Sequence, residues 1–500
     1  MFWLSLEKLL IKLYDYLKDK LSSKPTPSNT DLYLGEAQKL YYRDKNEKLF
    51  VSPQVRAKHL YLIGGTGMGK TSLIEHFIRQ DVAQGQGFCV IEPHGDLCEN
   101  LIRFLASLWA RQDRKGKIEI ARRTIIIEPF NLNAIISFNP LEVPENAPVY
   151  PCVLELMQVF KDKWEDMWGP RMAELLRSTL VVLAERRLTL LEAPLFLTDT
   201  RFRNSLIENL ENQEVRDYFI YRYNRLREWD KVKYREPVLN KVSEFIFDKS
   251  IRYTIGQGSN SINFRQIIDD GKFVILNLSK GRLKINSLLL GGLFLAKLQM
   301  ASLSRTDIPF SQRRFFSLYV DEFQNFLAQD EAGDIETMLS ESRKYALGLT
   351  LANQNISQLN QKLLGTILGN VAVLISFRLS RKDALIISPE IDPDQKDKLT
   401  TDLINLKVGQ VYLKIKGEPH RLAQLPYPQA VKIDSKTVED FKNYSALFHS
   451  HSAQEIERQI RTRQERLGIR NPENNSRVSE RENRPARGRT DTEQEGQNDW

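Results

Sequence analysis

A run of apolar residues that breaks into a glycine-rich loop and then a helix constrains this chain more than any other feature. Residues 64–71 read GGTGMGKT and match the pattern G-x-x-x-x-G-K-[ST] in full. The strand-like run HLYLIGG (59–65) leads into the loop, and the helical stretch TSLIEHFIRQ (71–80) follows it. This context predicts a loop whose backbone N–H groups, with the positive end of the helix, bind phosphates.

The residues of this phosphate loop predicted to contact a nucleotide form one unbroken set: Gly65, Thr66, Gly67, Met68, Gly69, Lys70, Thr71 and Ser72. Lys70 is expected to bridge the β- and γ-phosphates of ATP, and the Thr71 hydroxyl to ligate Mg²⁺. Random glycine-rich turns rarely meet all of these conditions. We therefore favour ATP and Mg²⁺ as cofactors over a purely structural loop.

Two further strand-like runs end in polar side chains suited to hydrolysis. FFSLYVDE (315–322) ends in Asp321 and Glu322, and LGLTLANQ (347–354) ends in Gln354. Because ligands of α/β sheets bind at the carboxyl ends of the strands, these groups should lie beside the phosphate loop. Asp321 would hold Mg²⁺ through water, and Glu322 would deprotonate the attacking water. Gln354 would sense the γ-phosphate or position that water; an amide that satisfies a turn is the alternative.

Phosphoryl transfer also develops negative charge that a guanidinium can neutralise, often one from another subunit. Arg343, in SESRKYALG (340–348), and Arg378, in ISFRLSRKD (375–383), are the candidates, with Arg381 behind them. A surface or ion-paired role explains each arginine equally well, so both interpretations stay open.

The alternation of strand-like and helical runs predicts an α/β fold with a mainly parallel sheet covered on both faces. The alternation stops between residues 145 and 265, where helical periodicity indicates an inserted all-α domain. The predicted strands are 59–65, 88–93, 124–130, 272–279, 315–322, 347–354 and 372–379, with 409–417 near an edge.

Composition divides the ends of the chain from this core. SSKPTPSNT (22–30) is rich in helix breakers, and residues 453–500 hold ten Arg and ten acidic residues with few large apolar ones. A charged helix is expected to begin this tail, with disorder after Gly468. The predicted domains are 1–21 (amphipathic helix), 22–50 (linker and lead-in), 51–144 (first core part), 145–265 (all-α insert), 266–435 (second core part) and 436–500 (charged, largely disordered tail).

The first 21 residues place large apolar side chains at helical spacing and predict an amphipathic helix. Its charges, from Glu7 onward, exclude a signal peptide, and no segment of the chain has the roughly 20 uncharged apolar residues that span a bilayer. The helix packs on its own body or a neighbouring subunit, docks on a membrane surface, or binds a separate partner. We expect a cytoplasmic protein, with peripheral contact at the inner face of the membrane under the second interpretation.

Charge and cysteine content narrow the class of protein only slightly. The net charge of +8 is compatible with nucleic acid or an anionic membrane but is common in soluble enzymes. The three cysteines, Cys89, Cys98 and Cys152, have no metal-ligand spacing and fit a reducing compartment.

The motifs together resemble the HerA/FtsK superfamily of DNA-pumping ATPases, and within it the type IV coupling proteins of bacterial conjugation, the TraD/TraG group. The resemblance spans about residues 55–385. The coupling proteins carry their all-α domain at the place where this chain has the predicted insert. In the order of that family, the matching pieces are HLYLIGGTGMGKTSLI, IEPHGDL (91–97), FNPL (138–141), IIDDGKFVILNLSKG (267–281), LYVDEFQNF (318–326), LSESRKYALGLTLANQNISQL (339–359) and GNVAVLISFRLSRKDA (369–384). Two departures stand out: Glu92 replaces the usual Asp, and the two transmembrane helices with which coupling proteins typically begin are absent.

The resemblance implies a RecA-like P-loop NTPase core, a hexameric ring, ATP hydrolysis between subunits and translocation of DNA through a central channel. Lys70 and Thr71 would be the Walker A pair, Asp321 and Glu322 the Walker B pair, and Arg343 or Arg378 the arginine that acts in trans. His94 and Asp96 would lie near the site.

Three functions remain open from the sequence. The first is a coupling-type ATPase that brings DNA, with a bound relaxase, to a secretion channel. The second is a soluble HerA-like translocase that acts with a nuclease in DNA processing or phage defence. The third is a nucleotide-switched module that assembles protein partners. Residues 339–359 favour the first, the missing transmembrane helices favour the second, and the intact Glu322 counts against the third.

One segment of the insert is a candidate for contact with DNA. In RDYFIYRYNRLREWDKVKYRE (216–236), cations interleave with Tyr, Phe and Trp, which suits a single-strand groove with stacking platforms. The alternative is a helix with buried aromatic residues and solvated charges, and acidic residues dilute the patch. Both interpretations stay open.

Overall fold

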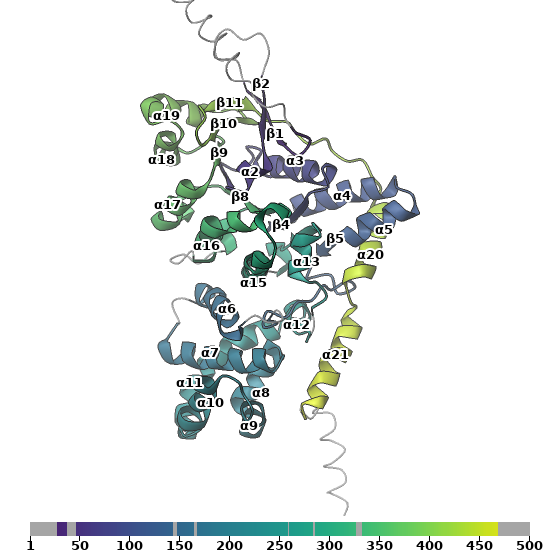
Figure 1. The fold of residues 1–500 in the computed structure, drawn as a ribbon, viewed down its shortest axis with the longest axis vertical. Helices are drawn as coiled ribbons and strands as arrows, with labels where there is room; N and C mark the ends of the chain where they lie inside the picture. The colour runs from purple at the N-terminus through teal and green to yellow at the C-terminus, as the bar shows by residue number, and fades with distance from the viewer. Residues whose placement is uncertain are drawn as a thin grey trace, which may run out of the picture.

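A sheet with helices packed against it forms the upper part of the molecule in Figure 1. The computed structural model describes residues 28–37, 47–143, 148–164, 168–258, 260–283, 286–326 and 333–468. Within these residues eleven strands form one sheet, in the order β2-β1-β11-β10-β9-β3-β8-β7-β4-β6-β5. The parallel strands are β3 (Leu60–Ile63), β4 (Gly87–Glu92), β5 (Thr124–Ile127), β6 (Phe273–Asn277), β7 (Phe316–Val320), β8 (Leu347–Asn353) and β9 (Val373–Ser376). All seven central strands predicted from the sequence are therefore confirmed.

Antiparallel strands extend the sheet beyond β9. They are β10 (Gln410–Ile415), β11 (Arg421–Gln424), β1 (Leu32–Ala37) and β2 (Glu47–Val51). The strand expected near an edge at 409–417 is β10. The assignment of residues 22–50 to a linker and lead-in did not include a strand, and β1 and the start of β2 lie within it. β1 pairs with its neighbour in the chain, β2, on one side and with β11, near the other end of the chain, on the other side, so a local pattern gives no sign of the second pairing.

Alternating side chains of the strands pack into two cores, one on each face of the sheet. Leu60 and Leu62 of β3 pack with α3 and α4, whereas Tyr61 and Ile63 belong to the core formed with α15, α16 and α17. This two-sided burial explains the continuous apolar runs of the strands. The helices of the core are α2 (Pro53–Arg56), α3 (Lys70–Ala83), α4 (Asp96–Ala110), α5 (Arg114–Arg123), α13 (Phe264–Asp269), α14 (Lys280–Leu283), α15 (Asn286–Leu303), α16 (Gly333–Glu341), α17 (Gln361–Asn370), α18 (Arg381–Ile391) and α19 (Lys396–Asn405).

The predicted insert is a helical domain that lies below the sheet in Figure 1. It joins the core through α6, which packs on α15. By length and composition Asn286–Asp307, which includes α15, is the one segment of the described residues able to cross a membrane, but 78% of its apolar window is buried. The helices of the domain are α6 (Val149–Lys163), α7 (Pro170–Glu185), α8 (Ala193–Thr198), α9 (Thr200–Ile207), α10 (Gln213–Asp217), α11 (Glu228–Ile246) and α12 (Lys249–Ile255).

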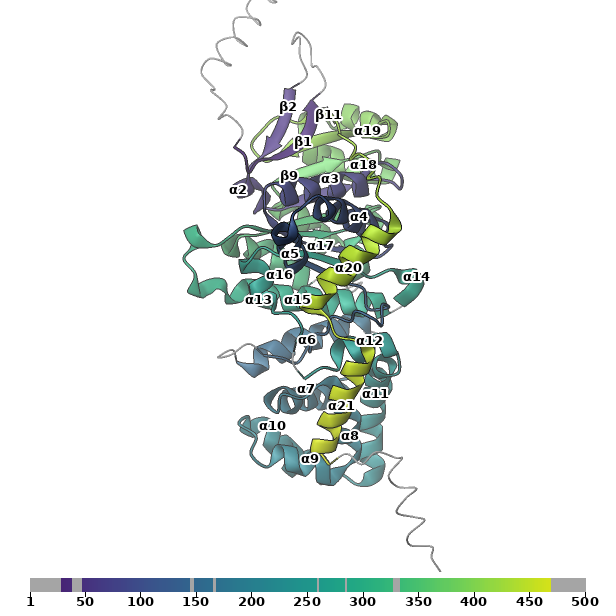
Figure 2. The ribbon, with the colours of Figure 1, turned by 90° about the vertical axis from the view of Figure 1, so that its right-hand side faces the viewer.

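Two C-terminal helices, α20 (Ser435–His449) and α21 (Ala453–Arg466), run along one side of the molecule as a strap (Figure 2). α20 packs against α4, α5 and the edge strand β5, and α21 contacts α12 of the helical domain. The charged helix predicted to begin near residue 453 is confirmed. The prediction of a largely disordered tail over 436–500 is wrong for α20 and α21, because both helices bury side chains against the body.

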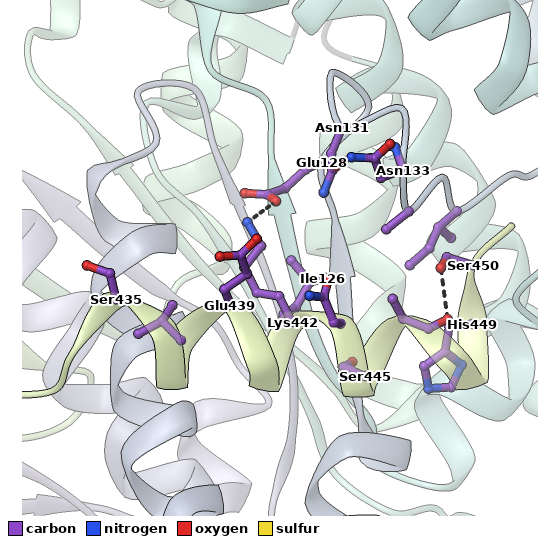
Figure 3. A pocket seen from close by; sticks show the side chains of 15 residues that line it. Ile126, Glu128, Asn131, Asn133, Ser435, Glu439, Lys442, Ser445, His449 and Ser450 are labelled. Atoms are coloured by element: carbon purple, nitrogen blue, oxygen red, sulfur yellow. Dashed lines mark hydrogen bonds and ion pairs between the residues drawn. The ribbon is translucent and has the colours of Figure 1, made fainter. Parts of the chain in front are cut away.

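The strap is fixed by polar contacts at both ends. On α20, Lys442 forms an ion pair with the buried Glu128 that follows β5, and both residues line a cavity of about 330 Å³ (Figure 3). On α21, Arg463 donates to Glu192 Oε1 at 3.1 Å, and Ile456 packs on Ile135. The edge of the sheet is thereby covered, which removes an unpaired strand from solvent. The predicted helix at residues 1–21 and the residues after 468 lie outside the described residues.

Candidate phosphate and metal site

The phosphate loop lies between β3 and α3, at the carboxyl edge of the sheet. Gly69, the residue before α3, has φ +109°, a left-handed conformation that favours glycine. A cleft of about 440 Å³ opens beside the loop. Of the predicted nucleotide contacts, those that line the cleft are Thr66, Gly67, Gly69, Lys70, Thr71 and Ser72. Gly65 and Met68 do not line it: Gly65 N donates to Arg378 O at 3.0 Å, and Met68 is buried.

The Lys70 ammonium lies inside the loop that precedes it. Its Nζ donates to the carbonyl oxygens of Gly64 at 2.7 Å and Gly65 at 3.4 Å, and only 5% of the residue is exposed. Burial lowers the pKa of Lys70, and the nearby Glu322 and Asp321 carboxylates oppose that shift. The Lys70 ammonium and the N-terminus of α3 thus bring positive charge to one side of the cleft, where an anionic group would be stabilised.

Thr71 and Asp321 come together although 250 positions separate them. Thr71 Oγ1 donates to Asp321 Oδ2 at 2.9 Å, and Asp321 follows the buried strand β7. Burial raises the pKa of Asp321, with the Glu322 carboxylate adding to the rise and the Thr71 hydrogen bond opposing it. A hydroxyl and a carboxylate oxygen suit Mg²⁺, which takes few protein ligands and completes its shell with water and phosphate oxygens. The described residues contain no cluster of three or more His, Cys, Asp and Glu side chains able to hold a metal.

The Glu322 carboxylate is held in place by two glutamines. Its Oε1 accepts from Gln354 Nε2 at 2.8 Å, and its Oε2 accepts from Gln324 Nε2 at 2.6 Å. Gln354 Oε1 in turn accepts from Thr66 Oγ1 at 2.9 Å. Glu322 has φ +49°, an uncommon conformation for a residue other than glycine and one that concentrates at functional sites. The contacts therefore join the phosphate loop to the predicted base through Gln354.

The two candidate arginines lie at opposite edges of the sheet. Arg378 follows β9 at the carboxyl edge, where its backbone carbonyl contacts the phosphate loop. Arg343 precedes β8 at the amino edge, near His59, which precedes β3. Burial lowers the pKa of His59 to about 4, and the Arg343 guanidinium adds to that lowering. Both arginine side chains are exposed, as is that of Arg381. The cleft of one chain thus has Arg378 beside it but not Arg343.

Glu92, which departs from the expected Asp, shapes the turn before α4. Its carboxylate accepts from His94 N at 2.7 Å and Gly95 N at 2.5 Å, and burial raises its pKa. The side chain of His94 lines the cleft, whereas Asp96 begins α4. Two lining residues have no sequence motif and were not predicted: Val408 and Tyr427.

The aromatic residues of the 216–236 segment divide into two groups. Tyr218, Phe219 and Tyr223 are buried in the helical domain, as the structural interpretation requires. Tyr221 and Trp229 are exposed and carry cations above their rings, Arg225 at 5.3 Å and Lys233 at 4.7 Å. The buried aromatic residues of the alternative interpretation are therefore confirmed for Tyr218, Phe219 and Tyr223, and contact of the exposed Tyr221 and Trp229 with DNA stays a prediction.

Comparison with known proteins confirms the resemblance predicted from the motifs. Residues 47–217 match the family model described as the type IV secretion-system coupling protein DNA-binding domain. No curated protein matches this chain in sequence. The structure of plasmid coupling protein TrwB in complex with the non-hydrolysable ATP analogue ADPNP is 14% identical, with 82% of this chain and 98% of that chain covered and a TM-score of 0.54. TrwB with ADP and Mg²⁺ gives the same identity and coverage at a TM-score of 0.52.

A second kind of protein has a similar fold. VirB4 of Thermoanaerobacter pseudethanolicus is 13% identical, with 83% of this chain and 99% of that chain covered and a TM-score of 0.53. The chain therefore has the fold of a coupling-protein-like P-loop ATPase, with a mainly parallel sheet and an inserted helical domain.

Proposed function

We propose that this chain is a Mg²⁺-dependent ATPase that moves DNA in conjugative transfer, with hydrolysis at the interfaces of a homo-hexamer. The observation that carries the proposal is the chain of hydrogen bonds from Thr66 through Gln354 to Glu322, beside the contact of Thr71 with Asp321. A purely structural loop does not need a carboxylate held in a strained conformation. The description of the matching family model supports DNA as the partner.

The residues of the cleft divide the chemistry among them. Thr71 and Asp321 would hold Mg²⁺, which when bound neutralises phosphate charge. Lys70 exchanges the carbonyl of Gly64 for phosphate oxygens. Glu322 accepts the proton of the attacking water, and Gln354 orients that water against the γ-phosphate.

Arg343 is proposed to act on the site of a neighbouring subunit, because it lies at the amino edge and its own phosphate loop lies at the carboxyl edge. We expect Arg343→Ala to lower ATP turnover by about 10²-fold or more. Mixing Arg343→Ala with Lys70→Ala protein should restore part of the activity, since some interfaces then pair an intact Lys70 with an intact Arg343. Arg378→Ala is the matched control, because Arg378 lies beside the phosphate loop of its own chain. In a mixture with Lys70→Ala every site then lacks either Lys70 or Arg378, so no activity should be restored. Failure of the Arg343 mixture to recover would overturn the assignment.

DNA is expected to stimulate hydrolysis by the full chain. Phosphate release would be measured with single-stranded, duplex, linear and circular DNA at several salt concentrations, because contacts with the DNA backbone weaken as salt rises. Mass measurement with an ATP analogue and DNA should give a hexamer. A hydrolysis rate that does not change with any form or length of DNA would contradict a DNA motor.

A further inference from the structure

Two exposed apolar side chains, Val408 and Tyr427, line the cleft beside the phosphate loop. Val408 is 56% exposed and Tyr427 is 52% exposed. The other lining residues are glycines or carry polar side chains. These two side chains give an otherwise polar cleft one apolar side, an arrangement typical of sites that bind a ligand with both a charged and an apolar part.

The antiparallel strands bring both side chains to this edge of the sheet. β10 runs antiparallel to β9, so its start lies at the carboxyl edge, and Val408 precedes it. β11 reverses direction again, so the chain returns to the same edge and reaches Tyr427. In the strand order β10 and β11 lie on the β9 side of β3. Gln354 and Glu322 follow β8 and β7, which lie on the other side of β3. The apolar pair and the predicted base therefore flank the phosphate loop from opposite sides.

Close backbone contacts fix the pair against the phosphate loop. Gly409 N donates to Met68 O at 3.3 Å, and Leu425 N donates to Gly409 O at 2.9 Å. Gly409 has φ +79°, and a Cβ placed on it would lie 2.5 Å from the Tyr427 hydroxyl. A Cβ on Gly69 would lie 3.9 Å from the same oxygen. The hydroxyl end of Tyr427 thus lies close to two glycines, one of them in the phosphate loop, and the positive φ of both positions favours glycine.

We propose that Val408 and Tyr427 form a base shelf, on which the purine ring of the nucleoside triphosphate stacks against Tyr427 and contacts Val408 at its edge. This inference rests on the proposed function, since it gives a binding site for the base of the same nucleotide whose phosphates the loop is proposed to bind. A nucleoside triphosphate has a charged end and a planar end, and the cleft has a polar side at Glu322 and an apolar side at Tyr427. Aromatic stacking accepts any base, so ATP and GTP should bind about equally and pyrimidine nucleotides more weakly.

The test compares a ligand that has a base with one that lacks it. Calorimetry on the full chain would give Kd values for ATP and for inorganic tripolyphosphate, each with Mg²⁺. We expect Tyr427→Ala to raise the Kd for ATP by about tenfold or more. The Kd for tripolyphosphate should stay within about twofold of its value in the unchanged protein. Tyr427→Phe should keep the affinity for ATP, because the ring is retained. Phe310→Ala is the matched control, since Phe310 is an exposed aromatic residue outside the cleft.

Lys70→Ala separates failure of the base shelf from failure of the phosphate site. If Lys70→Ala weakens the binding of both ligands while Tyr427→Ala leaves the affinity for ATP unchanged, the base shelf is wrong and the proposed function stands. If the unchanged protein binds neither ligand, the proposed function fails and the base shelf fails with it. Tyr427→Trp supplies a second measurement: its added fluorescence should change with ATP and not with tripolyphosphate, and an equal response to both ligands would overturn the stacking.

Discussion

Lys70→Ala is expected to lower ATP hydrolysis by about 10³-fold or more while the protein stays folded. The Lys70 ammonium is buried in the phosphate loop, where it contacts the carbonyl of Gly64 and where its charge is worth more than in water. Alanine removes that charge from the β- and γ-phosphates. Folding should survive, because the change removes a desolvated cation and leaves the glycines of the loop in place.

Phosphate release at saturating ATP would measure the effect of Lys70→Ala, with thermal unfolding as the test of folding. Lys362→Ala is a suitable control, since Lys362 is an exposed lysine in a surface ion pair with Glu336. That variant should hydrolyse ATP at the normal rate. Residual turnover above about a tenth of normal in Lys70→Ala would overturn the assignment of the phosphate site.

Glu322→Gln is expected to stop chemistry without stopping binding. Removing a general base costs about 10²–10⁴-fold in turnover. The amide has nearly the same shape and still offers one oxygen to Gln354 or Gln324, so the geometry of the cleft should persist. ATP should then bind with normal or higher affinity and remain intact.

Single-turnover assays and nucleotide retention would separate these two steps for Glu322→Gln. Gln324→Ala serves as the control, because it removes one contact to the Glu322 carboxylate and leaves the base in place; it should lose far less activity. Equal losses in both variants, or a loss of ATP binding in Glu322→Gln, would contradict the role of Glu322 as the base.

The sequence could predict the centre of this fold because its signals are local and continuous. Buried parallel strands such as β7 and β8 are unbroken apolar runs, and their last residues are the functional ones. The phosphate loop is likewise a contiguous pattern. For these reasons the amino-acid sequence alone is enough to place Lys70, Thr71, Asp321, Glu322 and Gln354 at one site.

What the sequence could not predict depends on distant pairings. Buried Arg56 donates to Asp81 at 2.7 and 2.8 Å, and Tyr319 donates to the same carboxylate at 2.6 Å. Strand position separates Arg343 from Arg378, although the two are equally suitable as isolated arginines. Val408 and Tyr427 meet the phosphate loop only through the reversal of β10 and β11. None of these relations has a period or a motif.

The strap determines which domain first receives a mechanical load applied after α21. α20 is held on the sheet by Lys442, and α21 is held on the helical domain by Arg463, with only residues 450–452 between them. A tilt of the helical domain against the sheet must therefore bend this short link or break the Arg463 contacts. Residue 468 lies two positions after the end of α21, so a mechanical load applied there reaches the helical domain before the nucleotide cleft.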